Sequence, residues 1–438
     1  MPIQNEWTEK LSPELKKPYS NEAERQRVII ETTKGSTTEL QKLIEANQGT
    51  IHRELTIVPS LVAELPVGAF ETVATSGRVR YIWQDVVTQA MMDVTAREIG
   101  VTAAHEHGYT GNGVVVAVLD TGISPHLDLS EPNRILAWND FVNQNGSPYD
   151  DHGHGTHVAG IIAGSGHASE GKYRGVAPEA RLVGVKVLDK NGKGWVSDVI
   201  AGIEWCLQNL KVLNIRLINL SLGSPAQLNS RWDPLCRATT EAWQRGVVVC
   251  TASGNNYNVA GITLSPAINP SIITVGNIDQ DTIVLEPDPM SPKAGQQFKI
   301  KPDLVAPGSN VTSLDLDEGY ITYSGSSMAT PLVAGAVALI LQKWPYLKPD
   351  QVKYVLAKRS RNLGLGSYLQ GSGALDLAKI FGPVRKPVFQ AKGVSKFASQ
   401  VLVNTVMNLL AQRSSETPQS GSEILIKTIM SVLGNMGK

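Results

Sequence analysis

The sequence has few cysteines, no excess of charge of either sign and no long hydrophobic run. Its 40 basic and 40 acidic residues cancel, so no bulk field favours nucleic acid or an anionic membrane, and partners must be recognised locally. The longest apolar run, Leu332 to Leu341, is shorter than the ~20 residues that span a bilayer, which argues against a membrane span. Three cysteines, Cys206, Cys236 and Cys250, cannot pair completely within the chain, and this favours a reducing compartment over secretion.

The N-terminal segment also argues against secretion. Met1 to Ser20 is polar and rich in Lys and Glu, without the charged-then-apolar order of a signal peptide. We therefore expect a cytoplasmic protein. Secretion would require that a leader had been trimmed from this sequence.

The first ninety residues predict a small domain behind a short arm. We expect residues 1–20 to form a flexible arm. Residues 21–90 alternate short strands and helices in the order β-α-β-β-α-β, which is typical of an α+β domain of the ferredoxin-like kind. The expected elements are a strand at 28–32, a helix at 38–46, two strands within 51–65, a helix at 69–75 and a strand at 79–83.

Residues 91–382 have a different texture, in which β-branched apolar runs alternate with helical stretches. Continuous apolar strands predict a mostly parallel sheet sandwiched by helices, so we expect an α/β domain here. The expected strands are 114–119, 181–188, 217–220, 247–251 and 272–275, and the expected helices are 196–210, 232–243 and 328–342.

Residues 383–438 predict a helical tail interrupted by the Ser/Thr/Pro/Gly-rich linker 414–422. Its amphipathic helices either pack back on the domain or on a second copy, or bind a membrane surface or a partner. The sequence leaves the oligomeric state open.

Three segments carry the residue types of a hydrolase with an activated serine. The first ends the expected strand 114–119 with Asp120-Thr121-Gly122, at the edge where open α/β sheets place their sites. A carboxylate there can orient a histidine. Taken alone, an ordinary strand-end Asp in a turn is the commoner explanation.

The second segment, His152-Gly153-His154-Gly155-Thr156-His157, opens a helix with three histidines. A metal site is the alternative, but a structural zinc site needs four ligands and no cysteine lies nearby in the sequence. His154 stands at the helix start. His157, one turn further on, fits a buried and hydrogen-bonded residue.

The third segment, 323–331, places serines at the N-terminus of the long apolar helix. Ser327 would lie near the positive helix end, where its own N–H can point at a developing oxyanion. Ser324 and Ser326 could cap the helix equally well, so spacing alone does not identify the nucleophile. Pro331 is expected in the first turn, where proline is tolerated. In a further segment, the amide of Asn255 could supply a second oxyanion donor, and a Gly-Asn turn is the alternative.

These segments together resemble the subtilisin-like serine protease (subtilase) family over roughly residues 96–381, and look closest to its bacterial intracellular members. The chain order Asp120, His154, Ser327 is the order of subtilisin. The resemblance implies a serine endopeptidase with these residues as its triad and Asn255 as oxyanion donor. It selects the first histidine of His-Gly-Thr-His and the serine directly before Met328.

The resemblance also implies the substrate contacts. Residues 219–223 look like the strand that lines the pocket, and 188–195 like the edge strand that pairs with an extended peptide. Leu264 falls near the pocket floor, which suggests a shallow pocket for medium apolar or small side chains. The expected substrate-binding residues are Ser221, Leu222, Gly223, Gly192, Gly194, Ser253, Gly254 and Leu264.

Residues 21–90 resemble the propeptide of the family, a folding assistant and inhibitor whose end lies in the cleft. Self-cleavage is therefore expected near residues 89–93, which makes the chain a self-inhibited precursor. The expected partners are polypeptide substrates and this propeptide, with no nucleic acid and no membrane span.

Two segments depart from the family pattern. Residues 163–173 do not match the Asn-containing loop of the strong calcium site in secreted members, so structural calcium stays possible but its ligands are unknown. The chemistry itself requires no cofactor. Residues 279–301 are Pro-rich and suggest a mobile insertion near the cleft.

Two other functions compete with peptide hydrolysis. One is a protease-like protein that holds peptides without cutting them, although such proteins usually lose a triad member. The other is a different acyl hydrolase, such as an esterase.

Overall fold

The computed structural model describes residues 6–33, 38–90, 99–130, 133–226, 230–254, 264–278 and 301–382. Residues 1–383 form one compact unit, and residues 384–438 form a second. The predicted C-terminal tail and nearly all of the Pro-rich segment lie outside the described residues.

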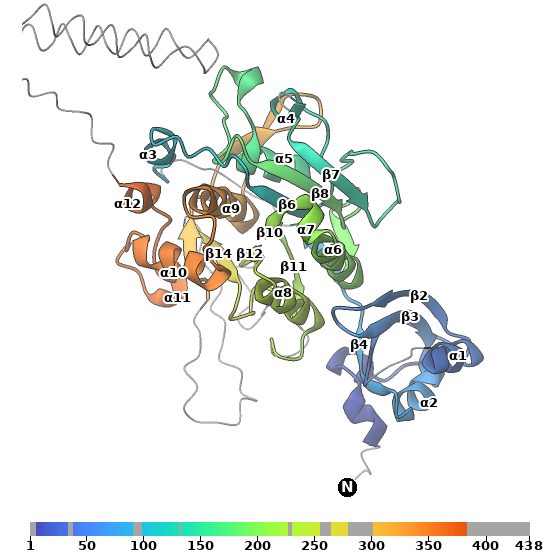
Figure 1. Ribbon diagram of the computed structural model, residues 1–438. Helices are drawn as coiled ribbons and strands as arrows, with labels where there is room; N and C mark the ends of the chain where they lie inside the picture. The colour runs from blue at the N-terminus through green and yellow to red at the C-terminus, as the bar shows by residue number, and fades with distance from the viewer. Residues whose placement is uncertain are drawn as a thin grey trace, which may run out of the picture. The chain divides into compact units, whose positions relative to one another are not determined.

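The N-terminal domain has the predicted β-α-β-β-α-β order (Figure 1). Its four strands form an antiparallel sheet in the order β2-β3-β1-β4, with β1 paired to both β3 and β4. This confirms the ferredoxin-like arrangement expected from the sequence. The elements are β1 (Arg25–Thr32), α1 (Thr38–Ala46), β2 (Thr50–Leu55), β3 (Ser60–Pro66), η3 (Val67–Ala69), α2 (Phe70–Thr75) and β4 (Val79–Gln84).

Side chains on both faces of this antiparallel sheet are buried, most of them on β1, β3 and β4. Val28 and Ile30 of β1 pack with the apolar side chains of α1 and α2 in the domain's own core. Ile29, between them, belongs instead to the core cluster of the larger domain, as does Trp83 of β4. Successive strand residues point to opposite faces, so the weak alternation of β1 follows from a sheet that is covered on both sides.

The first residues differ from the predicted flexible arm. Within the described part, η1 (Glu6–Lys10) and η2 (Pro13–Lys16) form short 3-10 turns. Leu11 and Leu15 are buried in the core of the N-terminal domain, and Lys10 Nζ donates to the Ala74 carbonyl at 2.8 Å. Two buried leucines in a polar segment are enough to anchor it, and composition alone does not reveal them.

The larger domain is built on a seven-stranded sheet in which every neighbouring pair is parallel. This confirms the predicted α/β class, although β7 and β15 were not predicted. In spatial order the strands are β15 (Leu304–Ala306), β14 (Ile273–Asn277), β12 (Val248–Ala252), β10 (Ile215–Leu220), β6 (Val115–Asp120), β8 (Arg181–Lys186) and β7 (Ile135–Asp140).

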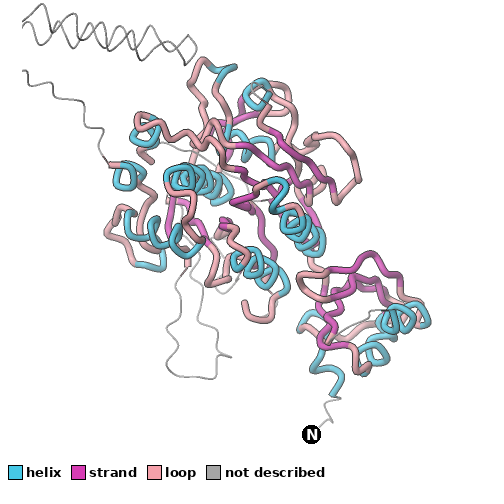
Figure 2. Tube along the Cα trace, viewed as in Figure 1, coloured by secondary structure: helices cyan, strands magenta, loops and turns pink. Residues whose placement is uncertain are grey.

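Helices cover both faces of the parallel sheet (Figures 1 and 2). Helices α5 (His154–Ala163) and α9 (Ser326–Lys343) contact each other and the sheet, and α6 (Val196–Gln208) and α8 (Pro234–Gln244) do the same on the other side. The remaining helices are α3 (Val101–His105), α4 (Leu127–Ser130), η4 (His167–Ser169), α7 (Leu210–Leu213), α10 (Pro349–Arg359), α11 (Ser367–Gln370) and α12 (Leu377–Phe381).

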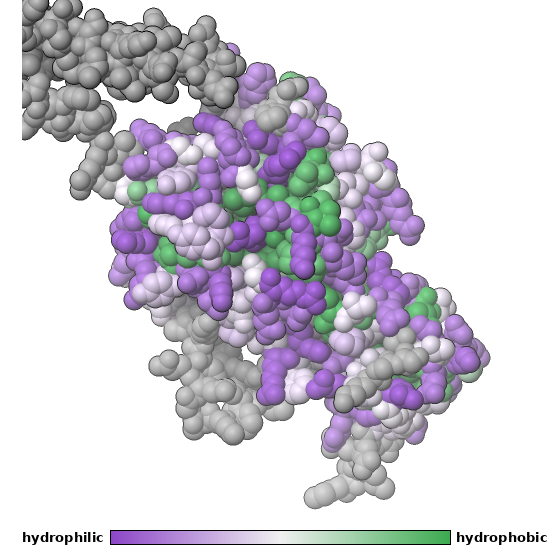
Figure 3. Space-filling view, viewed as in Figure 1, coloured by the Kyte–Doolittle hydropathy of each residue, from purple (hydrophilic) through white to green (hydrophobic). Residues whose placement is uncertain are grey.

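Helix α9 is long and apolar enough to pass a composition test for a membrane span, but 89% of it is buried inside the protein. It is the central helix of the core. On the face drawn in Figure 3, hydrophilic side chains cover most of the surface, and hydrophobic ones gather toward its middle.

A third, smaller sheet joins the two domains. Strand β5 (Val87–Ala90), at the end of the N-terminal domain, lies between β9 (Lys193–Trp195) and β11 (Leu222–Pro225) and is antiparallel to both. Strand β13 (Leu264–Ser265) extends the sheet beyond β11. A hairpin of β16 (Val311–Leu314) and β17 (Tyr320–Tyr323) completes the described strands.

Candidate active site

The carboxyl edge of the parallel sheet brings Asp120 and His154 together. Asp120 is the last residue of β6 and His154 the first of α5, and both side chains are fully buried. His154 Nδ1 lies 2.6 Å from Asp120 Oδ1, the short distance of a charge-assisted hydrogen bond. A carboxylate in this position fixes the tautomer of the imidazole and leaves Nε2 to accept a proton.

Two glycines allow the Asp120 turn to approach helix α5. A side chain at Gly155 would place its Cβ 2.1 Å from the Gly122 carbonyl, and Gly122 itself has a φ of +131°. The Gly155 N–H donates to Thr121 Oγ1 at 2.9 Å. Any larger residue at 155 would push the histidine away from the carboxylate.

The start of α5 is held by Asp150, which the sequence did not single out. Its buried carboxylate accepts from the Gly153 N–H at 2.9 Å and from the Thr156 hydroxyl at 2.7 Å. Burial raises the pKa of Asp150, but these and further hydrogen bonds outweigh it and leave the pKa below its usual value. The carboxylate thus anchors the helix end that carries His154.

The other two histidines have separate surroundings. His157 is fully buried, and its Nε2 lies 2.9 Å from the Val311 carbonyl. Burial, with the nearby His154, lowers the pKa of His157 to about 3, so it is a neutral structural residue. The His152 ring lies 6.3 Å from the His154 ring. No group of three or more His, Cys, Asp or Glu that could hold a metal occurs among the described residues.

Ser327 is the second residue of α9, and Ser221 holds it from two directions. Ser327 Oγ donates to the Ser221 carbonyl at 3.1 Å, and Ser221 Oγ donates to the Ser327 carbonyl at 2.9 Å. Pro331 explains the second bond. It is the sixth residue of the helix rather than part of the first turn as predicted, and it has no N–H to bond the Ser327 carbonyl.

The segment after β12 lies at the same helix end. The Gly254 N–H donates to Ser326 Oγ at 3.1 Å, so Ser326 serves as an acceptor there. Ser253 is buried, and its Oγ has no hydrogen-bond partner among the described residues. Asn255, the predicted oxyanion donor, lies outside the described residues.

Strands β9 and β11 flank an extended segment, strand β5. Leu222 lies opposite Ala90 and Gly223 opposite Gln89, while Gly194 lies opposite Thr88. These three positions were among the expected substrate contacts. Of the others, Gly192 lies in the turn before β9, donating to the Asp189 carbonyl at 2.9 Å, and Leu264 is buried in β13 opposite Pro225.

The N-terminal domain also contacts helix α6 directly. Asp85 Oδ1 accepts from the Ser197 N–H at 3.0 Å and its Oδ2 from the Ser197 hydroxyl at 2.6 Å. An acidic residue at a helix N-terminus is stabilised by unpaired N–H groups and the helix dipole. Further along α6, the Glu204 carboxylate accepts from the Thr56 N–H at 3.1 Å.

Two arginines of the N-terminal domain add ion pairs on α6. Arg53 Nη2 lies 3.1 Å from Asp198 Oδ1, and Arg27 Nη2 lies 4.0 Å from the same oxygen. Both guanidinium groups also stack on aromatic rings of the larger domain, Arg27 over Trp195 at 4.9 Å and Arg53 over a phenylalanine. These contacts were not predicted, since each joins residues far apart in the chain.

The loop at 163–173, which departs from the family's calcium loop, lies beside one buried carboxylate. The carboxylate beside it, Asp128, is fully buried. Its Oδ1 accepts from the Ala168 N–H at 2.8 Å and its Oδ2 from the Tyr320 hydroxyl at 2.8 Å. Both oxygens of Asp128 therefore take part in protein hydrogen bonds, and structural calcium stays a prediction.

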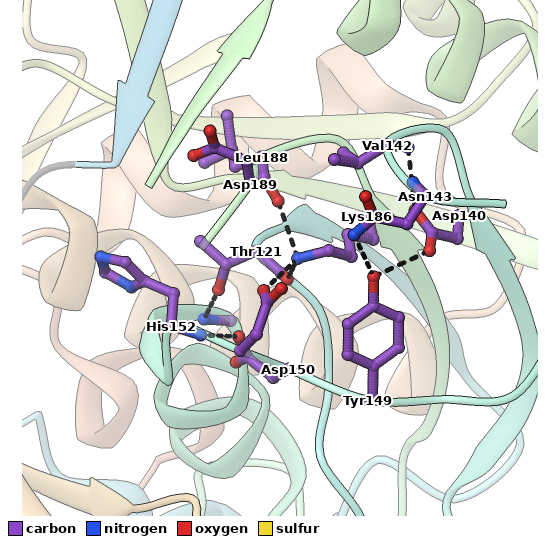
Figure 4. Close-up of polar contacts among 12 residues, drawn as sticks. Thr121, Asp140, Val142, Asn143, Tyr149, Asp150, His152, Lys186, Leu188 and Asp189 are labelled. Carbon is purple, nitrogen blue, oxygen red and sulfur yellow. Dashed lines mark hydrogen bonds and ion pairs between the residues drawn. The ribbon is translucent and has the colours of Figure 1, made fainter. Parts of the chain in front are cut away.

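Sequence reasoning also missed a buried lysine at the candidate site. Lys186 ends β8 after the apolar run Leu182–Val185 and is fully buried next to the Asp120 turn (Figure 4). The signal was present in the sequence, because a lone lysine in a strand that is otherwise apolar must find partners when it is buried.

Comparison with known proteins adds three findings. The subtilase family model matches residues 111–374. The chain is 40% identical over 317 residues to serine protease AprX of Bacillus subtilis (strain 168), covering 66% of this chain and 71% of that protein. It is 41% identical over 274 residues to subtilisin Savinase of Lederbergia lenta, covering 63% and 93% respectively.

A solved structure resembles the fold. Fervidolysin from Fervidobacterium pennivorans, a keratinolytic enzyme related to subtilisin, matches with a TM-score of 0.62 at 21% identity. The match covers 86% of this chain and 63% of fervidolysin, so the chain spans less than two thirds of that protein's length. This likeness concerns the fold alone.

Proposed function

Because the chain belongs to the subtilase family, we propose that it is a serine endopeptidase that acts through Asp120, His154 and Ser327. The observation that carries this proposal is the buried 2.6 Å contact between His154 and Asp120 at the sheet edge, beside the helix end that presents Ser327. Members of this family need no cofactor for catalysis, so the steps follow from side chains alone.

In the proposed reaction, His154 takes the proton of Ser327 Oγ as that oxygen bonds to the substrate carbonyl carbon. The same proton then passes to the leaving amine as the peptide bond breaks. Water, activated by His154, hydrolyses the acyl-enzyme. The Asp120 carboxylate stabilises the imidazolium throughout.

We assign the oxyanion donors to the Ser327 N–H and the Asn255 side chain. The hydrogen bond from Gly254 to Ser326 supports this assignment, because it ties the residue before Asn255 to the start of α9. Removal of the equivalent asparagine in subtilisin costs about 10² to 10³ in kcat, and we expect a comparable loss here.

The N-terminal domain acts in this proposal as an inhibitor that the enzyme cleaves from itself. Strand β5 lies between β9 and β11 in the manner of an extended substrate, with Ala90 opposite Leu222. The described pairing ends at Leu222, next to Ser221, whose carbonyl accepts from Ser327 Oγ. We therefore propose that self-cleavage breaks the peptide bond between Met91 and Met92.

We further propose that the enzyme cuts extended segments of other polypeptides. Main-chain pairing with β9 and β11 demands an extended chain but little sequence. A pocket limited by Leu264 would favour medium apolar or small side chains, and the methionine before the proposed cleavage point is of that kind. Efficient cleavage after Phe and Tyr alone would contradict this preference.

Cysteine usage supports an intracellular location. Cys206, Cys236 and Cys250 are all buried free thiols. Burial raises the pKa of each thiol above its usual value, which makes them unreactive and leaves the fold independent of disulfides.

Replacement of the nucleophile tests the function. We expect Ser327→Ala to abolish peptide hydrolysis, labelling by a fluorophosphonate and cleavage of the chain, all measured on the purified full-length protein. The unaltered protein should show a new N-terminus at Met92 on sequencing. Ser324→Ala is the matched control, because its hydroxyl has no partner among the described residues, and it should retain all three properties. Processing that persists in Ser327→Ala would refute self-cleavage.

A further inference from the structure

Lys186 is a fully buried lysine that the reaction described above does not use. It lies at the end of β8, opposite Asp120 of β6 in the parallel pairing. A buried ammonium group is costly unless each of its three N–H bonds finds an acceptor. The identity of those acceptors therefore indicates what the residue does.

The ammonium group bonds to three separate segments around the site. Lys186 Nζ donates to the Thr121 carbonyl, to Asp151 Oδ1 at 2.6 Å and to the Leu188 carbonyl at 2.9 Å. Figure 4 shows the side chain reaching between Thr121 and Leu188, with Tyr149 beside it. The Tyr149 ring lies 5.0 Å from Nζ and covers the cation.

Each of these segments carries a different part of the proposed machinery. Thr121 directly follows Asp120, and its side chain accepts from the Gly155 N–H in α5. Asp151 belongs to the loop that leads into His154. Leu188 begins the segment that returns as β9, the strand paired with β5.

We propose that Lys186 is a positioning residue, whose buried charge holds the Asp120 turn, the loop before His154 and the peptide-binding strand β9 in one arrangement. The inference rests on the proposed function. The hydrogen bonds of Lys186 Nζ go to the Thr121 and Leu188 carbonyls and to Asp151, so it acts through the neighbours of the triad and through its charge. A positional error of about 1 Å in such a site can cost about 10² in rate.

The charge of Lys186 also affects His154. The titratable groups described around His154 are Asp120 on β6, His152 and Asp150 before α5, and His157 within it. The Lys186–Asp151 pair adds one cation and one anion at the edge of this group. Loss of the cation favours the imidazolium form of His154, and loss of the anion disfavours it.

Two variants with opposite expected effects test the proposal. In the full-length enzyme, Lys186→Met should lower kcat about 10- to 100-fold with a smaller change in KM. It should also move the acidic limb of the kcat/KM profile upward by about half a pH unit or more. Asp151→Asn should move that limb downward, and the double variant should lie between the two.

A fluorophosphonate titration corrects each measurement for the fraction of active enzyme. Lys211→Met is the control, because Lys211 is exposed on α7, remote in sequence from the site, and should leave both kcat and the profile unchanged. If Lys186→Met fails to fold, the shift of the acidic limb in Asp151→Asn alone tests the proposal. The proposal would be overturned if, in the folded variants, the acidic limb of the kcat/KM profile stayed within about 0.2 pH unit of that of the unaltered enzyme. An unaltered enzyme that hydrolyses no peptide would instead refute the proposed function.

Discussion

The sheet of the N-terminal domain and the seven-stranded sheet of the larger domain both bury side chains on their two faces, but by different means. The seven-stranded sheet is covered by its own helices, α5 and α9 on one side and α6 and α8 on the other. The antiparallel sheet has its own helices on one face only, and its other face joins the core cluster of the larger domain through side chains such as Ile29 and Trp83. The larger domain thus buries both faces of its sheet with its own helices. The N-terminal domain buries one face with its own helices, and residues of the larger domain bury the other, which we call the borrowed face.

This difference bears on release of the N-terminal domain. Cleavage of one peptide bond would leave the borrowed face in place, together with the Asp85 cap and the ion pairs on α6. Departure of the domain then exposes apolar surface at about 25 cal/mol per Å². We therefore expect the cleaved domain to stay bound as an inhibitor until it is degraded or unfolded.

The largest expected effect is on catalysis, with little effect on the packing of either sheet. Asp120→Asn keeps the shape of the side chain but allows the wrong tautomer of His154, and kcat should fall about 10⁴-fold. Neither sheet loses a packing contact, so the melting temperature should change little. Steady-state kinetics and calorimetry measure the two effects, and a variant with more than a tenth of normal kcat would contradict the assigned role.

The next largest expected effect is on binding of the cleaved N-terminal domain through its borrowed face. Trp83 is 1% exposed and packs in the cluster of the larger domain. Trp83→Ala should weaken binding of the cleaved N-terminal domain by about 3 to 5 kcal/mol, which is more than 100-fold in inhibition. Dilution of the processed complex, followed by assay of the released activity, measures it.

The neighbouring residue provides the matched comparison. Ile82 is fully buried on the opposite face, in the domain's own core. Ile82→Ala should lower the unfolding free energy of the N-terminal domain itself by about 2 to 5 kcal/mol, visible as loss of its circular dichroism signal at a lower denaturant concentration. Equal inhibition by the Trp83→Ala variant and the unaltered domain would show that this face is not borrowed.

The smallest expected effect is a pH dependence at α6. Burial raises the pKa of Asp198 to about 6, although Arg53 and Arg27 of the N-terminal domain act against the shift. The carboxyl is protonated more readily in the folded chain than in the unfolded one. Its contribution to stability is therefore full below about pH 4 and is lost as the pH rises through 6, up to about 3 kcal/mol.

Asp198→Asn removes this group from the titration. In the uncleaved Ser327→Ala chain, the unfolding free energy of the Asp198 protein should fall relative to its Asn counterpart between pH 4 and pH 7. Denaturant titrations at several pH values measure the difference. A difference that does not change with pH would mean that Asp198 keeps its ordinary titration in the folded chain.

The sequence predicted elements better than contacts. Strands β6, β10, β12 and β14 were placed within about two residues because apolar β-branched runs bounded by turns mark buried strands. Strands β7 and β15 were missed, and β7 is half-exposed and carries Trp138 and polar neighbours. The flexible arm was wrong in its described part because Leu11 and Leu15 find a core that composition does not show.

At the candidate site, the residue types were predictable and their supports were not. The order of Asp120, His154 and Ser327 and the glycines beside them are visible in the sequence, and the comparisons bear out the family. Asp150, Lys186 and Asp85 were not recognised, since each draws its role from partners that fold toward it. Pro331 was noted, but its effect on the Ser327 carbonyl depends on Ser221, more than a hundred residues away in the chain.

Sequence by itself determined which segments form strands and helices, the alternation that makes a parallel sheet and the ordered motifs that identify the family, because these depend on neighbours within a few residues. Tertiary structure alone decided that β5 lies between β9 and β11, that one sheet borrows its cover and that Lys186 joins three segments. Those outcomes depend on contacts between distant residues, which local periodicity cannot encode.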